Sequence, residues 1–217
     1  MTLFVDRQAE LGELNTLVTS AKRGKSEFVI IYGRRRVGKT TLLINWAEQS
    51  GLSYLYWVAR RETAEATRHS LARALWRWAY PDEVDIQPPR FGSWEALFEQ
   101  MGRMLGKDKP VIIIFDEFSY AAESDASLPS HLQAAWDHLF KNKPLILALA
   151  GSHIGMMVDM LGYHAPLYGR FTGQLPLSHL PFATVTDFFP NYSAEERVAT
   201  YAVLGGVAGY WERFNPD

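Results

Sequence analysis

Residues 33–40 of this chain of 217 residues read Gly33-Arg34-Arg35-Arg36-Val37-Gly38-Lys39-Thr40 and fit the pattern G-x-x-x-x-G-K-[ST] at every fixed position. The two glycines allow the backbone to curl, so that successive N–H groups and the start of the following helix face a bound anion. Lys39 then reaches the β- and γ-phosphates of a nucleotide, and the hydroxyl of Thr40 is placed to bind Mg²⁺. The pattern therefore predicts a phosphate-binding loop.

The sequence on both sides of the loop supports this prediction. Residues 28–32 form a short apolar, β-branched run, which is typical of a strand buried on both faces. Residues 39–50 show a helical pattern that Gly51 ends. Thr41 lies in the first turn of that helix and joins the loop among the residues expected to bind the nucleotide.

Short apolar runs and helical patterns alternate along much of the chain. Further strands are expected at 54–58, 111–115 and 145–149, and helices at 7–22, 62–79, 94–105, 129–141 and 153–161. This alternation predicts an α/β fold with a mostly parallel sheet that helices cover on both faces. A loop is expected at 80–93, which contains three prolines and a glycine.

The pattern changes in the last part of the chain. The β-rich pattern stops at Phe182, and residues 193–217 look helical around Gly205-Gly206. We therefore place a domain boundary near residue 180. Residues 1–180 are expected to form the α/β domain, and residues 181–217 the beginning of a helical subdomain.

Two adjacent acids, Asp116 and Glu117, follow the apolar run 111–115. Parallel sheets bind ligands at the carboxyl ends of their strands, which is where these acids fall. Asp116 is suited to hold Mg²⁺, directly or through water, and Glu117 to orient and deprotonate an attacking water. The alternative is a strand that simply ends in solvated polar residues.

Ser152 follows the strand expected at 145–149. Its hydroxyl is a candidate to contact the γ-phosphate or the attacking water. A second role is equally open, because Ser152 also stands where it could cap the helix that begins near Ile154. Both roles are compatible.

The arginines divide into two groups. For Arg34, Arg35 and Arg36 in the loop, we favour a solvated turn whose charge adds to the attraction for the anion over specific contacts. Arg170 is a candidate to neutralise charge in the transition state as an arginine finger, from the same chain or from a neighbouring one. An ordinary surface arginine is the alternative for Arg170.

Composition excludes several classes of function. The net charge is −2, with 22 Lys+Arg and 24 Asp+Glu, and this argues against a domain that mainly grips nucleic-acid backbone. There are no cysteines, and the six histidines show no H-E-x-x-H spacing, so we expect neither disulfides nor a structural metal. No signal-peptide core and no apolar run near the roughly 20 residues of a membrane span is visible. We expect a soluble cytoplasmic protein without a membrane partner.

With these residues identified, the chain resembles the archaeal-type ATPase family of the STAND and AAA+-like P-loop ATPases. The matching segments are Phe4-Val5-Asp6-Arg7-Gln8-Ala9-Glu10-Leu11, Tyr32 to Thr40, Phe115-Asp116-Glu117-Phe118, Gly151-Ser152, Leu167-Tyr168-Gly169-Arg170 and Leu204-Gly205-Gly206. The first of these segments resembles the amino-terminal hydrophobic-x-R-x-x-E motif, with Asp6 where glycine is commoner. The resemblance covers nearly the whole chain.

The resemblance implies a P-loop NTPase fold with a five-stranded parallel sheet in the order 5-1-4-3-2. The fifth strand would lie near 174–178, followed by a small helical lid. It also implies ATP as the nucleotide and places Arg7 near the base or ribose, the alternative being a surface residue at a helix start. Gly205-Gly206-Val207-Ala208 departs from the usual Gly-Gly-x-Pro, so a proline that would stiffen this turn of the lid is missing. Because the chain stops at Asp217, inside the expected lid, we expect it to be a fragment of a longer protein.

The expected function is Mg²⁺-dependent binding and hydrolysis of ATP that drives a conformational switch. One alternative is a regulatory module that binds nucleotide with little turnover, and another is the ATPase part of a DNA-associated protein. ATP and ADP are the expected ligands, and self-association or a protein partner is open. The sequence does not identify the biological process, the activating signal or the oligomeric state.

Overall fold

This computed structural model describes residues 4–83, 87–106 and 109–214, which form a five-stranded parallel sheet covered by helices. The strands are β1 (Glu27–Tyr32), β2 (Ser53–Val58), β3 (Val111–Asp116), β4 (Leu145–Gly151) and β5 (Gly173–Pro176). They lie in the order β2-β3-β4-β1-β5, and every neighbouring pair is parallel. Counted from the β5 edge, this is 5-1-4-3-2, so the expected α/β fold and strand order are confirmed.

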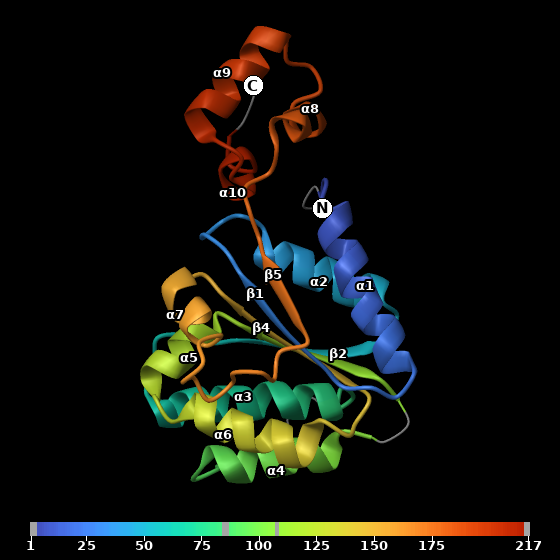
Figure 1. The fold of residues 1–217 in the computed structure, drawn as a ribbon, viewed down its shortest axis with the longest axis vertical. Helices are drawn as coiled ribbons and strands as arrows, with labels where there is room; N and C mark the ends of the chain where they lie inside the picture. Colours follow the sequence, from blue (N-terminus) through green and yellow to red (C-terminus); the bar gives the residue numbers. More distant parts are fainter. Residues whose placement is uncertain (1–3, 84–86, 107–108, 215–217) are drawn as a thin grey trace.

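Helices cover both faces of the sheet (Figure 1). The first face carries α1 (Gln8–Lys22) and α2 (Lys39–Gln49), and the second carries α3 (Ala64–Ala79), α4 (Trp94–Met104) and α6 (Leu128–Ala135). Two short helices, α5 (Phe118–Ser124) and α7 (Ile154–Asp159), follow β3 and β4 near the carboxyl edge of the sheet. The turns from β1 to α2, from β3 to α5 and from β4 to α7 therefore all lie at the carboxyl edge of the sheet.

The sheet separates two apolar cores. All residues of β3 are buried, and successive side chains of a strand point to opposite faces. Ile113 and Phe115 accordingly pack with the α3, α4 and α6 side, whereas Ile112 and Ile114 pack with the α1 and α2 side. Burial on both faces explains why the central strands read as continuous apolar runs.

The structure differs from the expected helices in two places. The helix expected at 129–141 is α6 followed by a π-helical turn, η1 (Trp136–Phe140). α5 was not expected, because it has only seven residues and therefore carries little periodic signal. Residues 84–86 of the expected loop, and 215–217 of the expected helical end, lie outside the described residues.

After β5 the chain forms a small helical segment, residues 181–214, which we call the lid. It contains η2 (Phe182–Thr184), α8 (Val185–Phe188), α9 (Ala194–Leu204) and α10 (Ala208–Trp211). Figure 1 shows the lid above the carboxyl ends of the strands, at the end of β5. The buried apolar residues of its core are Val185, Phe189 and Trp211, joined by Leu180 just before the lid. The domain boundary near residue 180 stays a prediction.

Candidate functional site

The loop between β1 and α2 uses its two glycines differently. Gly38 has a φ of 99°, in the left-handed region that side chains rarely adopt. Gly33 serves close packing instead, because a Cβ atom there would lie 2.3 Å from the carbonyl oxygen of Leu177, just after β5. The turn therefore requires glycine at position 38, and the nearby backbone of Leu177 requires it at position 33.

The Lys39 side chain lies inside this loop and is only 6% exposed. Its Nζ donates to the carbonyl oxygens of Gly33 and Arg34, at 2.9 and 3.0 Å, and to Ser152 Oγ at 2.9 Å. Burial lowers the pKa of the Lys39 ammonium, and the carboxylates of Glu117 and Asp116 offset part of this effect. A positive charge is thus held at the start of α2, where the helix dipole also attracts anions.

Asp116 ends β3 with a carboxylate that is almost fully buried, at 1% exposure. Its Oδ2 accepts hydrogen bonds from Thr40 Oγ1 at 2.6 Å and from the Tyr56 hydroxyl at 2.9 Å. Its Oδ1 accepts one from the Glu117 backbone N–H at 2.8 Å. A buried carboxylate needs such partners, and here they fix its orientation.

Glu117 has a left-handed backbone, with φ of 50°, at the point where β3 turns into α5. This conformation is uncommon for a residue other than glycine, and such residues cluster at functional sites. The Glu117 carboxylate accepts bonds from Ser152 Oγ at 2.7 Å and Ser152 N at 3.1 Å. Lys39, Ser152 and Glu117 therefore form one continuous hydrogen-bonded chain.

The interpretation of Ser152 as a helix cap is wrong. The cap position of α7 belongs to His153, which makes no capping hydrogen bond through its side chain. The Ser152 hydroxyl is engaged with Lys39 and Glu117 instead. Its position at the end of β4, beside the end of β3, brings it to the acids.

The oxygens of Thr40 and Asp116 fit a magnesium ion. Mg²⁺ prefers hard oxygen ligands, and in nucleotide sites it takes one or two from the protein and the rest from phosphates and water. A hydroxyl and a carboxylate 2.6 Å apart meet that requirement. Over the described ranges, no group of three or more His, Cys, Asp or Glu side chains could hold a metal ion. A cation here would therefore rely on nucleotide phosphates for further ligands.

A cavity of about 620 Å³ opens beside these groups, a volume in the usual range for small-molecule sites. The residues that line it from the α/β part of the chain are Arg35, Arg36, Gly38, Lys39, Thr40, Thr41, Glu117 and Ser152. Those that line it from the lid are Ala208, Gly209, Tyr210, Glu212 and Arg213. The lid touches the loop directly, since Gly209 N donates to the Arg36 carbonyl oxygen at 3.0 Å. The Arg36 guanidinium also lies 5.5 Å from the centre of the Tyr210 ring.

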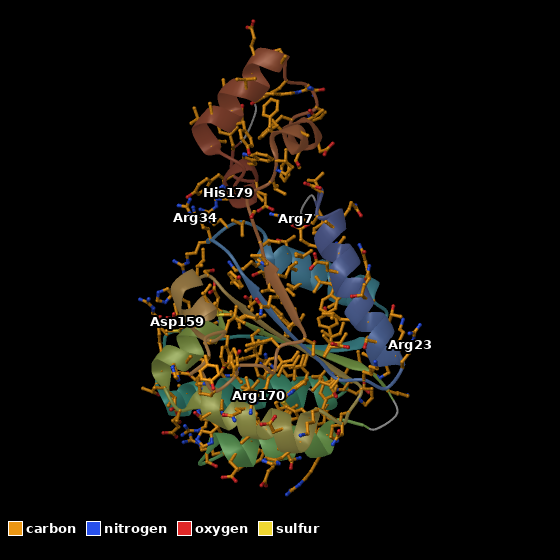
Figure 2. The ribbon with its side chains drawn as sticks, in the orientation of Figure 1. Arg7, Arg23, Arg34, Asp159, Arg170 and His179 are labelled. Atoms are coloured by element: carbon orange, nitrogen blue, oxygen red, sulfur yellow. The ribbon has the colours of Figure 1, made fainter. Side chains whose placement is uncertain are left out.

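The three loop arginines are all exposed but have different neighbours. Arg34 is not among the residues that line the cavity, and Figure 2 shows it near the junction of the sheet with the lid. Arg35 Nη2 donates to the Tyr120 hydroxyl at 2.8 Å. Arg36 has a left-handed backbone, with φ of 67°, and contacts the lid as described above. Their contribution to nucleotide binding stays a prediction.

Arg7 is buried, at 6% exposure, so its interpretation as a surface residue is wrong. Its guanidinium donates to the carbonyl oxygens of Val37 at 2.9 Å and Ser178 at 2.7 Å, and to Glu10 Oε1 at 2.8 Å. It thereby joins the loop to the segment between β5 and the lid (Figure 2). Arg7 is not among the residues that line the cavity, and its place near a base or ribose stays a prediction.

Asp6 explains one departure from the resemblance. Its φ is 62°, in the left-handed region, which accounts for a preference for glycine at this position. The carboxylate gives the chain something that glycine lacks, because Asp6 Oδ2 accepts a hydrogen bond from Thr184 Oγ1 in the lid at 3.1 Å.

The structure does not bring Arg170 to the cavity. Arg170 lies in the segment just before β5 begins, and its guanidinium pairs with Asp137 at 2.8 Å. This is the amino end of the strand, and Figure 2 shows Arg170 among the helices on the far side of the sheet from Arg34 and Arg7. Arg170 is therefore not among the residues that line the cavity, and its role as an arginine finger, from this chain or from a neighbouring one, stays a prediction.

Tyr56 was missed by sequence reasoning, which identified 54–58 only as a strand. Tyr56 is paired in register with Ile114, two residues before Asp116, so its side chain lies on the same face as the acid. Only the register between β2 and β3 identifies Tyr56 as a neighbour of Asp116, and this register cannot be predicted from the sequence pattern.

A profile of the family described as "ATPase domain predominantly from Archaea" matches residues 4–213. The chain belongs to this family. A curated relative of this archaeal-type ATPase domain is the uncharacterized protein MJECL04 of Methanocaldococcus jannaschii, which is 35% identical over 212 residues. The match covers 97% of this chain but 44% of the relative, so the chain spans less than half of that protein's length.

Solved structures share the fold of this archaeal-type ATPase domain. The Walker-type ATPase PABY2304 of Pyrococcus abyssi has a TM-score of 0.69 at 21% identity, over 96% of this chain and 66% of its own. The Aeropyrum pernix ORC2 protein in ADPNP-ADP complexes has 0.64 at 17%, over 97% and 60%. Drosophila ORC bound to DNA has 0.64 at 16%, over 96% and 54%. Among the described residues of this domain, no helix combines the length and apolar character needed to cross a bilayer.

Proposed function

We propose that this domain binds ATP together with Mg²⁺ and hydrolyses it to ADP and phosphate. The observation that carries the proposal is the hydrogen-bonded chain Lys39–Ser152–Glu117 at one cavity that Thr40 also lines, with Asp116 bonded to Thr40 behind it. Membership of an ATPase family supports the same chemistry. The components needed to hold a triphosphate and to activate water therefore lie side by side.

Binding starts from the positive potential of the loop. The N–H groups of residues 33–41 and the start of α2 would surround the phosphates, with Lys39 between the β- and γ-phosphates. In the structure, the Lys39 ammonium donates hydrogen bonds to two carbonyl oxygens of the loop and to Ser152 Oγ. A phosphate oxygen would replace these neutral acceptors with a charged one, which makes a stronger hydrogen bond. Bound Mg²⁺ would neutralise charge on the phosphates, with Thr40 and Asp116 as its protein ligands.

Hydrolysis requires a group that orients water and accepts its proton. In the proposed step, a water oxygen attacks the γ-phosphorus, the bond to the β–γ bridging oxygen breaks, and ADP leaves with that oxygen. Glu117 accepts the proton of the water. Ser152 holds both carboxylate oxygens of Glu117, so its role is to position this base.

The contacts of the loop with the lid support a conformational switch. Gly209 bonds the backbone of Arg36, and Arg7 bonds both Val37 and Ser178. A change of the loop on binding phosphate would therefore reach the lid by two routes. A nucleotide that has different contacts with the loop before and after hydrolysis would favour two different lid positions.

A regulatory module that binds nucleotide with little turnover is the second candidate. It is favoured by one observation: Ser152 donates two hydrogen bonds to the Glu117 carboxylate, and a carboxylate held in this way is less available to a water molecule. A role for this domain in a DNA-associated protein has no support from its net charge of −2. Turnover by the wild-type protein separates the two candidates.

The test combines titration calorimetry with Mg²⁺-ATP and a phosphate-release assay. We expect Lys39→Ala to abolish binding, and Glu117→Gln to bind ATP normally but not to hydrolyse it. Matched controls are Lys22→Ala, at an exposed lysine at the end of α1, and Glu123→Gln, within α5 and outside the cavity. Equal turnover by Glu117→Gln and wild type would remove the base assignment. Absence of any heat with well-folded wild type would refute the proposed function.

A further inference from the structure

The Tyr56 hydroxyl is placed at the predicted cation site by the edge strand of the sheet. β2 is the outermost strand on its side, next to β3, and Tyr56 lies opposite Ile114. Its hydroxyl donates to Asp116 Oδ2 at 2.9 Å, the same oxygen that Thr40 contacts at 2.6 Å. Burial, and then the charge of Asp116, raise the pKa of the Tyr56 phenol, so it remains a protonated donor at neutral pH.

The hydrogen bonds on Asp116 limit what its carboxylate can offer a cation. A carboxylate has about four lone-pair positions, two on each oxygen. Thr40 and Tyr56 use Oδ2, and the Glu117 backbone N–H uses Oδ1. Of these donors, Thr40 is itself a predicted metal ligand and the N–H belongs to the main chain. Tyr56 is the side-chain donor whose removal would free Oδ2 without altering a ligand.

We propose that Tyr56 is a positioning residue that makes this site prefer Mg²⁺ to a larger dication such as Ca²⁺. This rests on the proposed function, since the cation enters with the nucleotide. Ca²⁺ takes six to eight oxygen ligands and accepts a carboxylate through both oxygens. Mg²⁺ keeps several waters and demands a compact octahedral arrangement. By holding Oδ2, Tyr56 prevents Asp116 from presenting both oxygens to one cation.

Tyr54 provides a matched control on the same strand. It lies two residues before Tyr56, so both side chains leave the same face of β2. Burial, and then the charge of Glu48 on α2, raise the pKa of Tyr54. Its hydroxyl thus belongs to the environment of Glu48 rather than to that of Asp116. A tyrosine-to-phenylalanine change at either position removes one hydroxyl and little volume.

The experiment measures the affinity of a non-hydrolysable ATP analogue by calorimetry, with Mg²⁺, with Ca²⁺ and with a chelator. We expect Tyr56→Phe to reduce the ratio of Mg²⁺-supported to Ca²⁺-supported affinity by about three- to tenfold, the worth of one hydrogen bond. Affinity in chelator should stay unchanged, and Tyr54→Phe should keep the wild-type ratio. A second variant, Tyr56→Leu, should shift the ratio in the same direction, and thermal unfolding establishes that each variant is folded.

An unchanged Mg²⁺-to-Ca²⁺ ratio in Tyr56→Phe and Tyr56→Leu would overturn the assignment. If affinity fell by the same factor with both cations, this unchanged ratio would show that Tyr56 only supports the fold. If wild type itself bound no nucleotide with either cation, the proposed function would fail together with this inference, whereas an unchanged ratio refutes only the role of Tyr56.

Discussion

Removal of the Ser152 hydroxyl tests whether Glu117 is held in place for catalysis. Ser152→Ala deletes the 2.7 Å bond to Glu117 Oε1 and keeps the backbone bond to Oε2 at 3.1 Å. A hydrogen bond to a charged group contributes about 1.5–3 kcal/mol. If that energy orients the base in the transition state, kcat should fall by about 10- to 100-fold. KM should change less than kcat, because Lys39 loses one acceptor but keeps the carbonyl oxygens of Gly33 and Arg34.

The assay is the initial rate of phosphate release across ATP concentrations, which separates kcat from KM. Ser152→Thr keeps a hydroxyl and should retain most of the rate. The neighbouring variant His153→Ala is the second control, since His153 is exposed and does not line the cavity. A kcat for Ser152→Ala equal to that of wild type, or a change confined to KM, would refute the positioning role.

Three further predictions concern charge, packing and the distant arginine. Burial lowers the pKa of Lys39 in the folded protein below its ordinary value of 10.5. Between the lowered pKa and 10.5 the unfolded chain binds more protons at Lys39, so the free energy of unfolding should rise with pH there. Lys39→Met should remove this rise, as measured by urea unfolding without nucleotide. Gly206→Ala would place a Cβ 2.0 Å from the Leu180 carbonyl oxygen, so it should cost about 1–3 kcal/mol in thermal unfolding, unlike Gly155→Ala in open space. Arg170→Ala should lower stability by at most about 1 kcal/mol and leave phosphate release by dilute protein unchanged.

The sheet and the phosphate loop could be predicted because each has a strong local signal. Continuous apolar runs mark strands that are buried on both faces, and the fixed spacing of Gly33, Gly38 and Lys39 marks the loop. The strand order came from the family resemblance rather than from periodicity. Asp116 and Glu117 were found because acids directly after a buried strand are unusual enough to single out.

The remaining features depend on contacts between distant residues. The bond of Tyr56 to Asp116 requires the register of two strands, and the bond of Arg7 to Ser178 joins positions 171 residues apart. Neither leaves a mark in the local pattern. The position of Arg170 in a family motif likewise carries no information that it precedes β5, away from the cavity.

The four-residue core of the lid has a consequence for the motions of the molecule. The two cores around the sheet are far larger, whereas the apolar cluster of the lid has four buried members among the described residues, Leu180 just before it and Val185, Phe189 and Trp211 within it. Segments with few buried apolar contacts open first in the native state, as separate foldons. The lid should therefore exchange its amide hydrogens and admit proteases well before the sheet does. Trp211, 1% exposed, is positioned to report such breathing through its fluorescence.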